Sequence, residues 1–307
     1  MNAPPVFARI AVIGVGLIGG SIARAAIATG AAGAVRLWDV DPAVRARVDA
    51  LGLGEVAEDP AEAVTDCDLV VLCAPSGAMG AAAADVAPGL KPGAIVTDVG
   101  SVKAAVAAAV APVLPDGVHF IPGHPIAGTE QSGPDAGFAS LFEGRWCILC
   151  PPPEADPDAI ARLSAFWTAL GARVDTMDAT RHDLVLAMTS HLPHLIAFTI
   201  VATAEDVETL TESEVVKYSA GGFRDFTRIA ASDPTMWRDV FLLNREAVLD
   251  LLGRFSEDLT ALRRAIRWGD GDTLFATFER ARRMRKGVIE AGQDIAAPDF
   301  GRSRPQG

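Results

Sequence analysis

The chain has 307 residues, half of them hydrophobic and 21% charged, which excludes a disordered polypeptide. At roughly 150 residues per domain, this length predicts about two domains. Its 27 Lys and Arg and 39 Asp and Glu give a formal net charge of −12, which argues against binding to nucleic acid or to an anionic membrane.

The cysteines and the N-terminus narrow the class of protein further. Four cysteines do not form a disulfide framework, and the pair Cys147 and Cys150 lies in an apolar segment typical of a buried strand. We therefore expect these thiols to pack in the core, and we expect no metal site. The sequence has no basic leader segment and no uninterrupted apolar run of about 18 residues, so we expect a soluble, cytoplasmic protein without a membrane span.

The first half of the chain alternates short apolar strands with helical segments. This alternation is typical of an α/β fold with a parallel sheet covered by helices on both faces. Strands are expected at 9–14, 35–39, 68–73 and 94–98, and helices at 17–29, 77–87 and 101–111. Later strands are expected at 145–150 and 172–176, with a helix at 157–170 between them.

The pattern becomes helical after residue 178. Residues 181–252 and 256–291 have helical character, with no strand–turn–strand signal. The segment 192–204 is apolar nearly all round, which is typical of a helix buried in a bundle or in an interface. We therefore predict an α/β domain at 1–178 and an all-helical domain at 179–307.

A GxGxxG motif at residues 14–19 joins the first strand to the first helix. In this position the first glycine permits a tight turn, the second lets the backbone approach a pyrophosphate, and the third allows close helix packing. Asp39 ends the second strand, 20 residues after Gly19, where a carboxylate accepts hydrogen bonds from ribose hydroxyls and repels a 2′-phosphate.

The motif and Asp39 together predict a Rossmann-type domain that binds NAD in preference to NADP. The alternative is a glycine-rich turn in a protein that binds no nucleotide, and Ala74-Pro75 is equally well explained as an ordinary strand-exit turn. The expected cofactor-binding residues are Gly14, Gly16, Leu17, Ile18, Gly19, Asp39, Ala74 and Pro75.

Two polar segments follow later strands and contain candidates for chemistry. In 98–103 (DVGSVK), Ser101 either caps a helix or takes part in catalysis. In 123–133 (GHPIAGTEQSG), His124 lies just past an apolar strand and precedes a glycine-rich polar loop. A dehydrogenase that acts on an alcohol needs a base for the hydroxyl proton, and histidine titrates in the useful range. From its position alone, His124 is either that base or an ordinary loop residue.

These two segments resemble the prephenate/arogenate dehydrogenase family of tyrosine biosynthesis. Residues 189–194 (TSHLPH) and 221–230 (GGFRDFTRIA) match the same family in the helical part, and all four motifs occur in the family order. The resemblance covers residues 8 to 290. It implies NAD-dependent oxidative decarboxylation of a cyclohexadienyl acid, arogenate or prephenate or both, to tyrosine or 4-hydroxyphenylpyruvate. It also implies a homodimer formed through the helical domain.

The resemblance also implies a role for each site residue. His124 would accept the proton of the ring hydroxyl, and Ser101 would hydrogen-bond that hydroxyl or orient His124. Arg224 would hold a substrate carboxylate, for which its planar fork is well suited. His194 would line the substrate pocket, and Thr129 belongs to the substrate-binding set.

Each of these roles has an alternative. His194 can be a packed core histidine, and Arg224 can form an ion pair with Glu130 or Asp225. We expect three other histidines and one tryptophan to be structural: His119, His182, His191 and Trp237. Because the chain ends soon after its last expected helix, we expect no C-terminal regulatory domain.

Two other kinds of protein share the opening of this sequence. A β-hydroxyacid dehydrogenase would use a catalytic lysine in the second domain, but Lys217 is the only lysine between residues 104 and 285 and its neighbours do not match that motif. A non-catalytic NAD-binding protein would keep the glycines and lose the base. The sequence does not decide between arogenate and prephenate.

Overall fold

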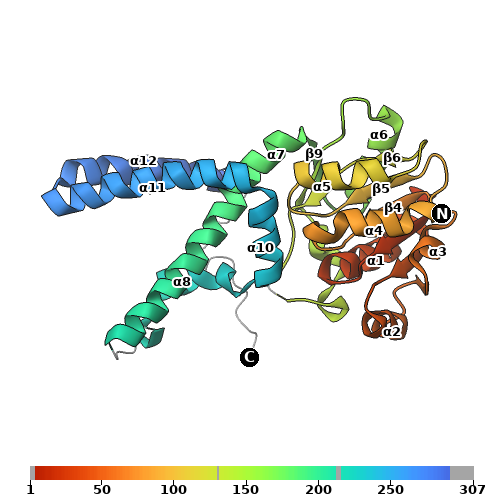
Figure 1. Cartoon of the computed structure of the whole chain (residues 1–307), viewed down its shortest axis with the longest axis horizontal. Helices are drawn as coiled ribbons and strands as arrows, with labels where there is room; N and C mark the ends of the chain where they lie inside the picture. Colours follow the sequence, from red (N-terminus) through yellow and green to blue (C-terminus); the bar gives the residue numbers. More distant parts are fainter. Residues whose placement is uncertain (1–3, 130, 212–215, 291–307) are drawn as a thin grey trace. The chain divides into compact units, whose positions relative to one another are not determined.

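The computed structural model describes residues 4–129, 131–211 and 216–290 (Figure 1). The chain forms two compact units, residues 1–249 and 250–307, and our predicted boundary at 178 lies within the first.

The strands are β1 (Phe7–Ile13), β2 (Ala32–Trp38), β3 (Glu55–Val56), β4 (Leu69–Leu72), β5 (Ile95–Asp98), β6 (His119–Phe120), β7 (Gly123–Pro125), β8 (Trp146–Leu149) and β9 (Arg173–Thr176). The helices are α1 (Leu17–Thr29), α2 (Pro42–Ala50), α3 (Pro60–Val64), α4 (Met79–Val86), α5 (Ala104–Val110), α6 (Pro157–Ala169), α7 (Ala179–Leu186), α8 (Leu192–Thr211), α9 (Gly221–Thr227), α10 (Pro234–Leu243), α11 (Arg245–Trp268) and α12 (Gly271–Glu290).

Six strands form the parallel sheet that the sequence predicts. Their order is β3-β2-β1-β4-β5-β6, and every neighbouring pair is parallel. The strands β2 and β3 lie on one side of β1, whereas β4, β5 and β6 lie on its other side, so the strand order reverses between β1 and β4. In such folds a dinucleotide binds at the carboxyl ends of the strands beside this reversal. The glycine motif follows β1 and Ala74 follows β4, so both lie at this point.

The side chains of the central strands alternate between two cores. In β1, Ile10 and Val12 enter one core while Ala11 and Ile13 enter the other. The first core includes residues of α1 and α6, and the second includes residues of α3, α4 and α5. Figure 1 shows helices on both faces of the sheet, with α4 and α5 side by side. A parallel sheet buried on both faces explains the continuous apolar runs.

The strands β7, β8 and β9 form a separate small sheet. β7 pairs antiparallel with β8, and β8 pairs parallel with β9. The segments 145–150 and 172–176 are therefore strands, as expected, but they do not extend the large sheet. β7 is only three residues long and was not expected. It pairs His124 with Ile148 and so fixes the backbone around the candidate base.

Four helices begin with the dipeptide Asp-Pro. The aspartate side chain accepts a hydrogen bond from a backbone N–H of the first turn, and the proline occupies a position where no N–H partner is needed. These local signals explain where the helices start, at Asp41-Pro42, Asp59-Pro60, Asp156-Pro157 and Asp233-Pro234.

The helical part differs from the expected pattern in two places. α11 runs without interruption through the gap expected at 252–256, and the break falls instead at Gly269, whose φ is 65°. A π-helical segment, Ala187–His191, lies between α7 and α8. Single π-helical turns occur often at functional sites.

The helical stretch 179–209 is long and apolar enough, by length and composition alone, to cross a membrane, with mean hydropathy 1.7 and 28% of the window buried. It also contains the buried polar residues His182, Asp183 and His191. Their hydrogen bonds join this stretch to residues of the sheet domain, as described below. The stretch is therefore part of the globular fold of the first compact unit.

Candidate active site

The glycine loop has the shape that a dinucleotide requires. Gly14 has a φ of 92°, and a Cβ there would lie 2.8 Å from the carbonyl oxygen of Cys73. A Cβ on Gly19 would lie 2.1 Å from the carbonyl oxygen of Gly14, whereas nothing lies within 4 Å of the position that a Cβ on Gly16 would take. The loop therefore packs tightly on its protein side and leaves open space at Gly16, where a pyrophosphate would approach.

Asp39 lies beside this loop. Its Oδ2 accepts a hydrogen bond from the N–H of Val15 at 2.7 Å, and its Oδ1 accepts one from Asp41 at 3.0 Å. The carboxylate is thus held at the first turn after β1. Leu17 and Ile18 form the start of α1, and Ala74 and Pro75 follow β4 at the same edge of the sheet.

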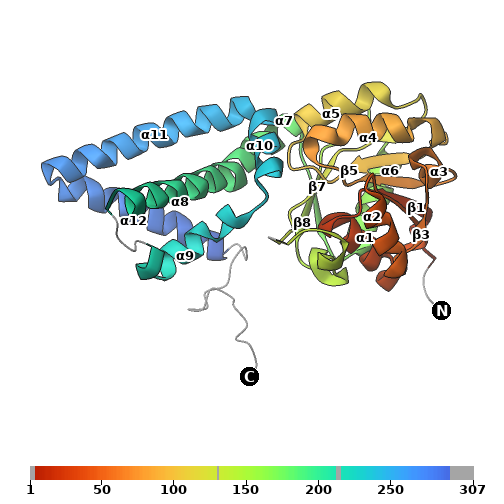
Figure 2. The same ribbon diagram turned by 60° about the horizontal axis from the view of Figure 1, so that its bottom comes forward.

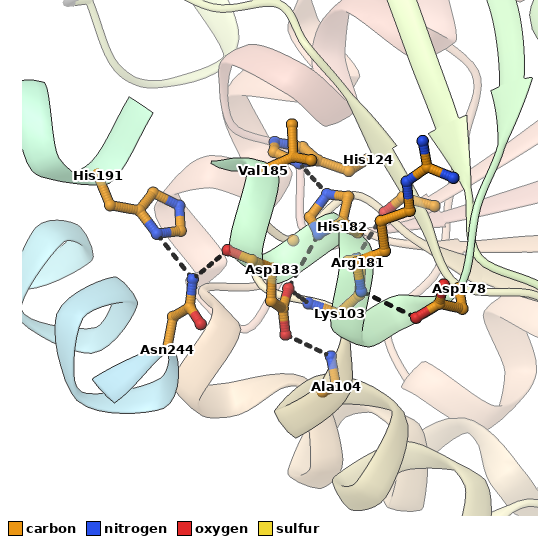
Figure 3. A network of polar contacts seen from close by, with 12 residues as sticks. Lys103, Ala104, His124, Asp178, Arg181, His182, Asp183, Val185, His191 and Asn244 are labelled. Atoms are coloured by element: carbon orange, nitrogen blue, oxygen red, sulfur yellow. Dashed lines mark hydrogen bonds and ion pairs between the residues drawn. The ribbon is translucent and has the colours of Figure 1, made fainter. Parts of the chain in front are cut away.

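His124 lies on β7 and is 9% exposed. Its Nδ1 is 2.8 Å from Nε2 of His182, and Nδ1 of His182 is 2.9 Å from Oδ1 of Asp183 (Figure 3). Burial lowers the pKa of His124 well below its usual value, and the charges of His182, Lys103 and His191 lower it further. His124 is therefore neutral near pH 7, which is the state that can accept a proton.

A buried ion pair supports the backbone next to His124. Lys103 and Asp98 are both fully buried and paired, and the Lys103 ammonium also donates to the carbonyl of Gly123 at 2.6 Å. Asp98 accepts hydrogen bonds from the N–H groups of Gly100 and Gly123. This pair joins the end of β5 to the start of β7, so the segment 98–103 sets the position of Gly123, the residue before His124.

Ser101 lies in the same segment but does not cap a helix. α5 begins at Ala104, its N-cap residue is Lys103, and the N–H groups of Lys103 and Ala104 donate to the carboxylate of Asp183. The structure therefore removes the capping alternative for Ser101. Burial lowers the pKa of His191 to about 4, although a hydrogen bond with the backbone of Ser101 acts in the opposite direction and raises it. Ser101 is thus close to the network around His191.

His191 and Asn244 extend this network into the helical part. The amide nitrogen of Asn244 donates to the carbonyl of Asp183 at 2.8 Å and lies 3.0 Å from Nδ1 of His191. Both residues are buried. Figure 3 shows the side chain of Asn244 in contact with His191 and with Asp183. The sequence argument expected His182 and His191 to be structural and did not predict the hydrogen-bonded network that links His124 to His182 and Asp183 and continues through Asn244 to His191. The available signal was the pair His182-Asp183 in the first turns after residue 178, which is too short to be specific.

His194 lies one turn further along α8. Its Nδ1 lies 2.8 Å from the carbonyl of Ser190, to which it donates, and its ring stacks on the buried Trp237 with centroids 3.7 Å apart. Burial lowers its pKa. Trp237 packs in the helical part, as expected, and it also fixes the plane of the His194 ring.

Arg224 and Arg228 line a hollow of about 540 Å³ near α9. The helix α9 lies beside α8 (Figure 2). The other lining residues are Ser219, Phe223, Thr227 and Ala231. Arg224 is 66% exposed and lies 4.0 Å from Asp225, which is one of its two expected alternative partners. Glu130, the other, lies outside the described residues. The sequence argument named only Arg224, but the geometry presents two arginines to the same hollow.

Three remaining residues have simple environments. Thr129 is exposed, and its hydroxyl accepts a hydrogen bond from the N–H of Gln131 at 3.2 Å. Cys147 and Cys150 are buried free thiols, and burial raises the pKa of Cys150 to about 12. Such thiols are unreactive, which agrees with their expected role in packing.

Comparison with known proteins identifies the family. Residues 22–176 match the model of the prephenate dehydrogenase nucleotide-binding domain, and residues 178–280 match that of the prephenate dehydrogenase dimerization domain. The chain belongs to the prephenate dehydrogenase family. The two matches meet at the predicted change from alternating to helical sequence, and together they cover most of the chain.

Several family members are similar over their full length. The chain is 45% identical to cyclohexadienyl dehydrogenase of Zymomonas mobilis, over 94% of this chain and 99% of that protein. The structure of prephenate dehydrogenase from Aquifex aeolicus in complex with hydroxyphenyl propionate and NAD⁺ matches with a TM-score of 0.85 at 33% identity, covering 92% of this chain and 98% of that one. Synechocystis arogenate dehydrogenase matches with a TM-score of 0.77 at 26% identity, covering 91% and 99%.

Proposed function

We propose that His124 is the base of an NAD-dependent oxidative decarboxylation at this site. The chain is a cyclohexadienyl (prephenate/arogenate) dehydrogenase of tyrosine biosynthesis. The observation that carries the role of His124 is its environment: a buried, neutral imidazole whose Nδ1 is engaged by His182. The proton of the substrate must therefore be accepted at Nε2.

The cofactor loop fits NAD. When bound, NAD accepts a hydride from the ring carbon that carries the hydroxyl. The open space at Gly16 accommodates a pyrophosphate, and Asp39 supplies an acceptor for the ribose hydroxyls. We propose that Leu17, Ile18, Ala74 and Pro75 line the rest of this site. The carboxylate of Asp39 would repel a 2′-phosphate, which supports a preference for NAD over NADP.

The remaining chemistry belongs to this chain and its substrate. His124 takes the hydroxyl proton as the C–H bond breaks, and the resulting carbonyl lets the ring carboxylate leave as carbon dioxide. Loss of carbon dioxide makes the ring aromatic, so the reaction is effectively irreversible. We propose that Ser101 hydrogen-bonds the substrate hydroxyl, since it lies in the segment that also positions Gly123 and His124. These residues act by holding the reacting groups together.

The helical part supplies the groups for the substrate carboxylates. A guanidinium binds a carboxylate through two parallel hydrogen bonds, and the hollow near α9 presents Arg224 and Arg228. We propose that one of them holds a carboxylate, with Arg224 as the sequence-based candidate. The stacked ring of His194 and the hydroxyl of Thr129 are proposed to line the same substrate site.

We further propose that the enzyme is a cytoplasmic homodimer. The match to the family's dimerization domain supports this, as do the large apolar side chains that the helical part leaves exposed. Large contiguous apolar surfaces on soluble proteins mark interaction sites. The exposed side chains include Leu184, Val185, Met188, Ile200, Val201, Leu242, Leu249, Leu259, Ile266, Trp268, Phe275, Phe278 and Met284.

The substrate is identified by steady-state kinetics. Formation of NADH, followed by absorbance, gives kcat/KM for arogenate and for prephenate with each of NAD and NADP. We expect turnover of at least one substrate with NAD and a lower kcat/KM with NADP. Absence of turnover with both substrates would refute the proposed function.

A further inference from the structure

The candidate base makes a buried contact with a histidine of α7. His124 on β7 and His182 on α7 are 58 residues apart in sequence. Their rings meet edge to face, with centroids 5.1 Å apart. The contact joins Nδ1 of His124 to Nε2 of His182. His182 is fully buried, so water does not compete for this hydrogen bond.

Asp183 fixes the other nitrogen of His182. Its Oδ1 accepts hydrogen bonds from Nδ1 of His182 at 2.9 Å and from the N–H of Lys103 at 2.7 Å. Its Oδ2 accepts one from the N–H of Ala104 at 2.9 Å. The backbone donors leave this carboxylate no freedom to rotate away, and an ionised carboxylate only accepts hydrogen bonds. Nδ1 of His182 must therefore carry a proton.

We propose that His182 and Asp183 are positioning residues that hold His124 in the one tautomer able to act as a base; this role rests on the proposed function. Neutral His182, with its proton on Nδ1, presents a lone pair at Nε2. That lone pair accepts the Nδ1–H of His124, which leaves Nε2 of His124 unprotonated and ready for the hydroxyl proton. In this chain of hydrogen bonds, the Nδ1–H of His124 donates to Nε2 of His182, and the Nδ1–H of His182 donates to Oδ1 of Asp183.

The same arrangement stabilises the product of proton transfer. When Nε2 of His124 takes the substrate proton, the ring becomes a cation and its Nδ1–H bond to His182 strengthens. His182 passes this polarisation to the Asp183 carboxylate, which keeps its negative charge and is not protonated. No proton is lost or gained by His182 or Asp183, and Nε2 of His124 releases its proton to water after the product leaves.

The tautomer can be read directly by ¹⁵N NMR of histidine side chains, without turnover. The chain has five histidines, so each ring is assigned by substituting it in turn. We expect neutral His124 to carry its proton on Nδ1 in the wild type. In His182→Phe the acceptor of the Nδ1–H of His124 is gone, so the proton of neutral His124 should no longer be confined to Nδ1. A wild-type His124 protonated on Nε2, or an unchanged tautomer in His182→Phe, would overturn the proposal.

Kinetics supply a second test that leaves the contacts of Asp183 with α5 in place. His182→Phe removes the acceptor and should lower kcat about 10- to 100-fold, with KM for NAD within about twofold of wild type. His182→Gln returns an amide oxygen as acceptor and should recover part of that loss. The matched control is His119→Gln, because His119 is a partly exposed histidine 3.9 Å from Asp156, outside this network. Equal kcat in wild type, His182→Phe and His182→Gln would refute the positioning role.

Failure of this inference can be distinguished from failure of the proposed function. If the enzyme turns over neither arogenate nor prephenate, the tautomer measurement still reports whether His182 and Asp183 orient His124. If turnover is normal but the tautomer is the opposite one, the proposed function stands and the positioning role falls.

Discussion

Replacing Lys103 by Met should destabilise the protein strongly, because it leaves the carboxylate of Asp98 buried without its cation. Both residues are fully buried, and the ammonium also donates to the carbonyl of Gly123 at 2.6 Å. Removing one partner of a buried ion pair costs about 3–5 kcal/mol. For a chain of this size that lowers Tm by about 5–8 °C. Thermal unfolding followed by circular dichroism measures the change.

The neutral double variant provides the control. Asp98→Asn with Lys103→Met leaves no uncompensated charge, so it should recover part of the lost stability, although the single amide oxygen can accept from only one of the N–H groups of Gly100 and Gly123. kcat should remain low in both variants, since Gly123 precedes the base. A Tm within about 2 °C of wild type in the single variant would refute the reasoning.

Three further predictions concern the cofactor, pH and the substrate. Asp39→Asn removes the charge that repels a 2′-phosphate, so the ratio of kcat/KM with NAD to kcat/KM with NADP should fall at least about 10-fold; an unchanged ratio contradicts the role of Asp39. The pKa of His191 is about 4 in the folded protein, below its ordinary value of 6.5, which applies to the unfolded chain. Between pH 4 and 6.5 the unfolded state therefore binds more protons than the folded state, so the protein loses stability as the pH falls below 6.5. The titration of His191 alone should lower the free energy of unfolding by about 2 kcal/mol between pH 7.5 and pH 5. In urea unfolding, the stability of His191→Gln should therefore depend less on pH than that of the wild type, and an identical pH dependence would refute this prediction. Arg224→Ala and Arg228→Ala should differ in substrate KM, with a rise of about 10- to 100-fold for the arginine that holds a carboxylate; an unchanged KM in Arg224→Ala removes its proposed role.

The cofactor half of the site could be read from the sequence because its signals are local. Gly14, Gly16 and Gly19 act within one strand–turn–helix unit, and Asp39 ends the next strand. The apolar runs of the parallel sheet are equally local, and the parallel sheet that alternation predicts is the one observed. Element ends were less well predicted, since Gly253 lies inside α11 and the break falls at Gly269.

The chemical half depends on contacts that no local pattern encodes. The sequence predicts only a structural role for His182, and its proposed role depends on its approach to His124, 58 residues away in sequence. Lys103 follows Ser101 in a recognisable segment, but its burial against Asp98 and Gly123 comes from the junction between two sheets. The short strand β7 escaped prediction because three residues carry no periodicity.

The central claim is that His124 is the base of an NAD-dependent oxidative decarboxylation. The most direct test measures kcat for His124→Asn on arogenate and prephenate by NADH absorbance, with NAD binding measured in parallel by fluorescence titration. The account predicts a loss of kcat of at least about 100-fold with NAD affinity nearly unchanged. Turnover close to that of the wild-type enzyme would contradict it.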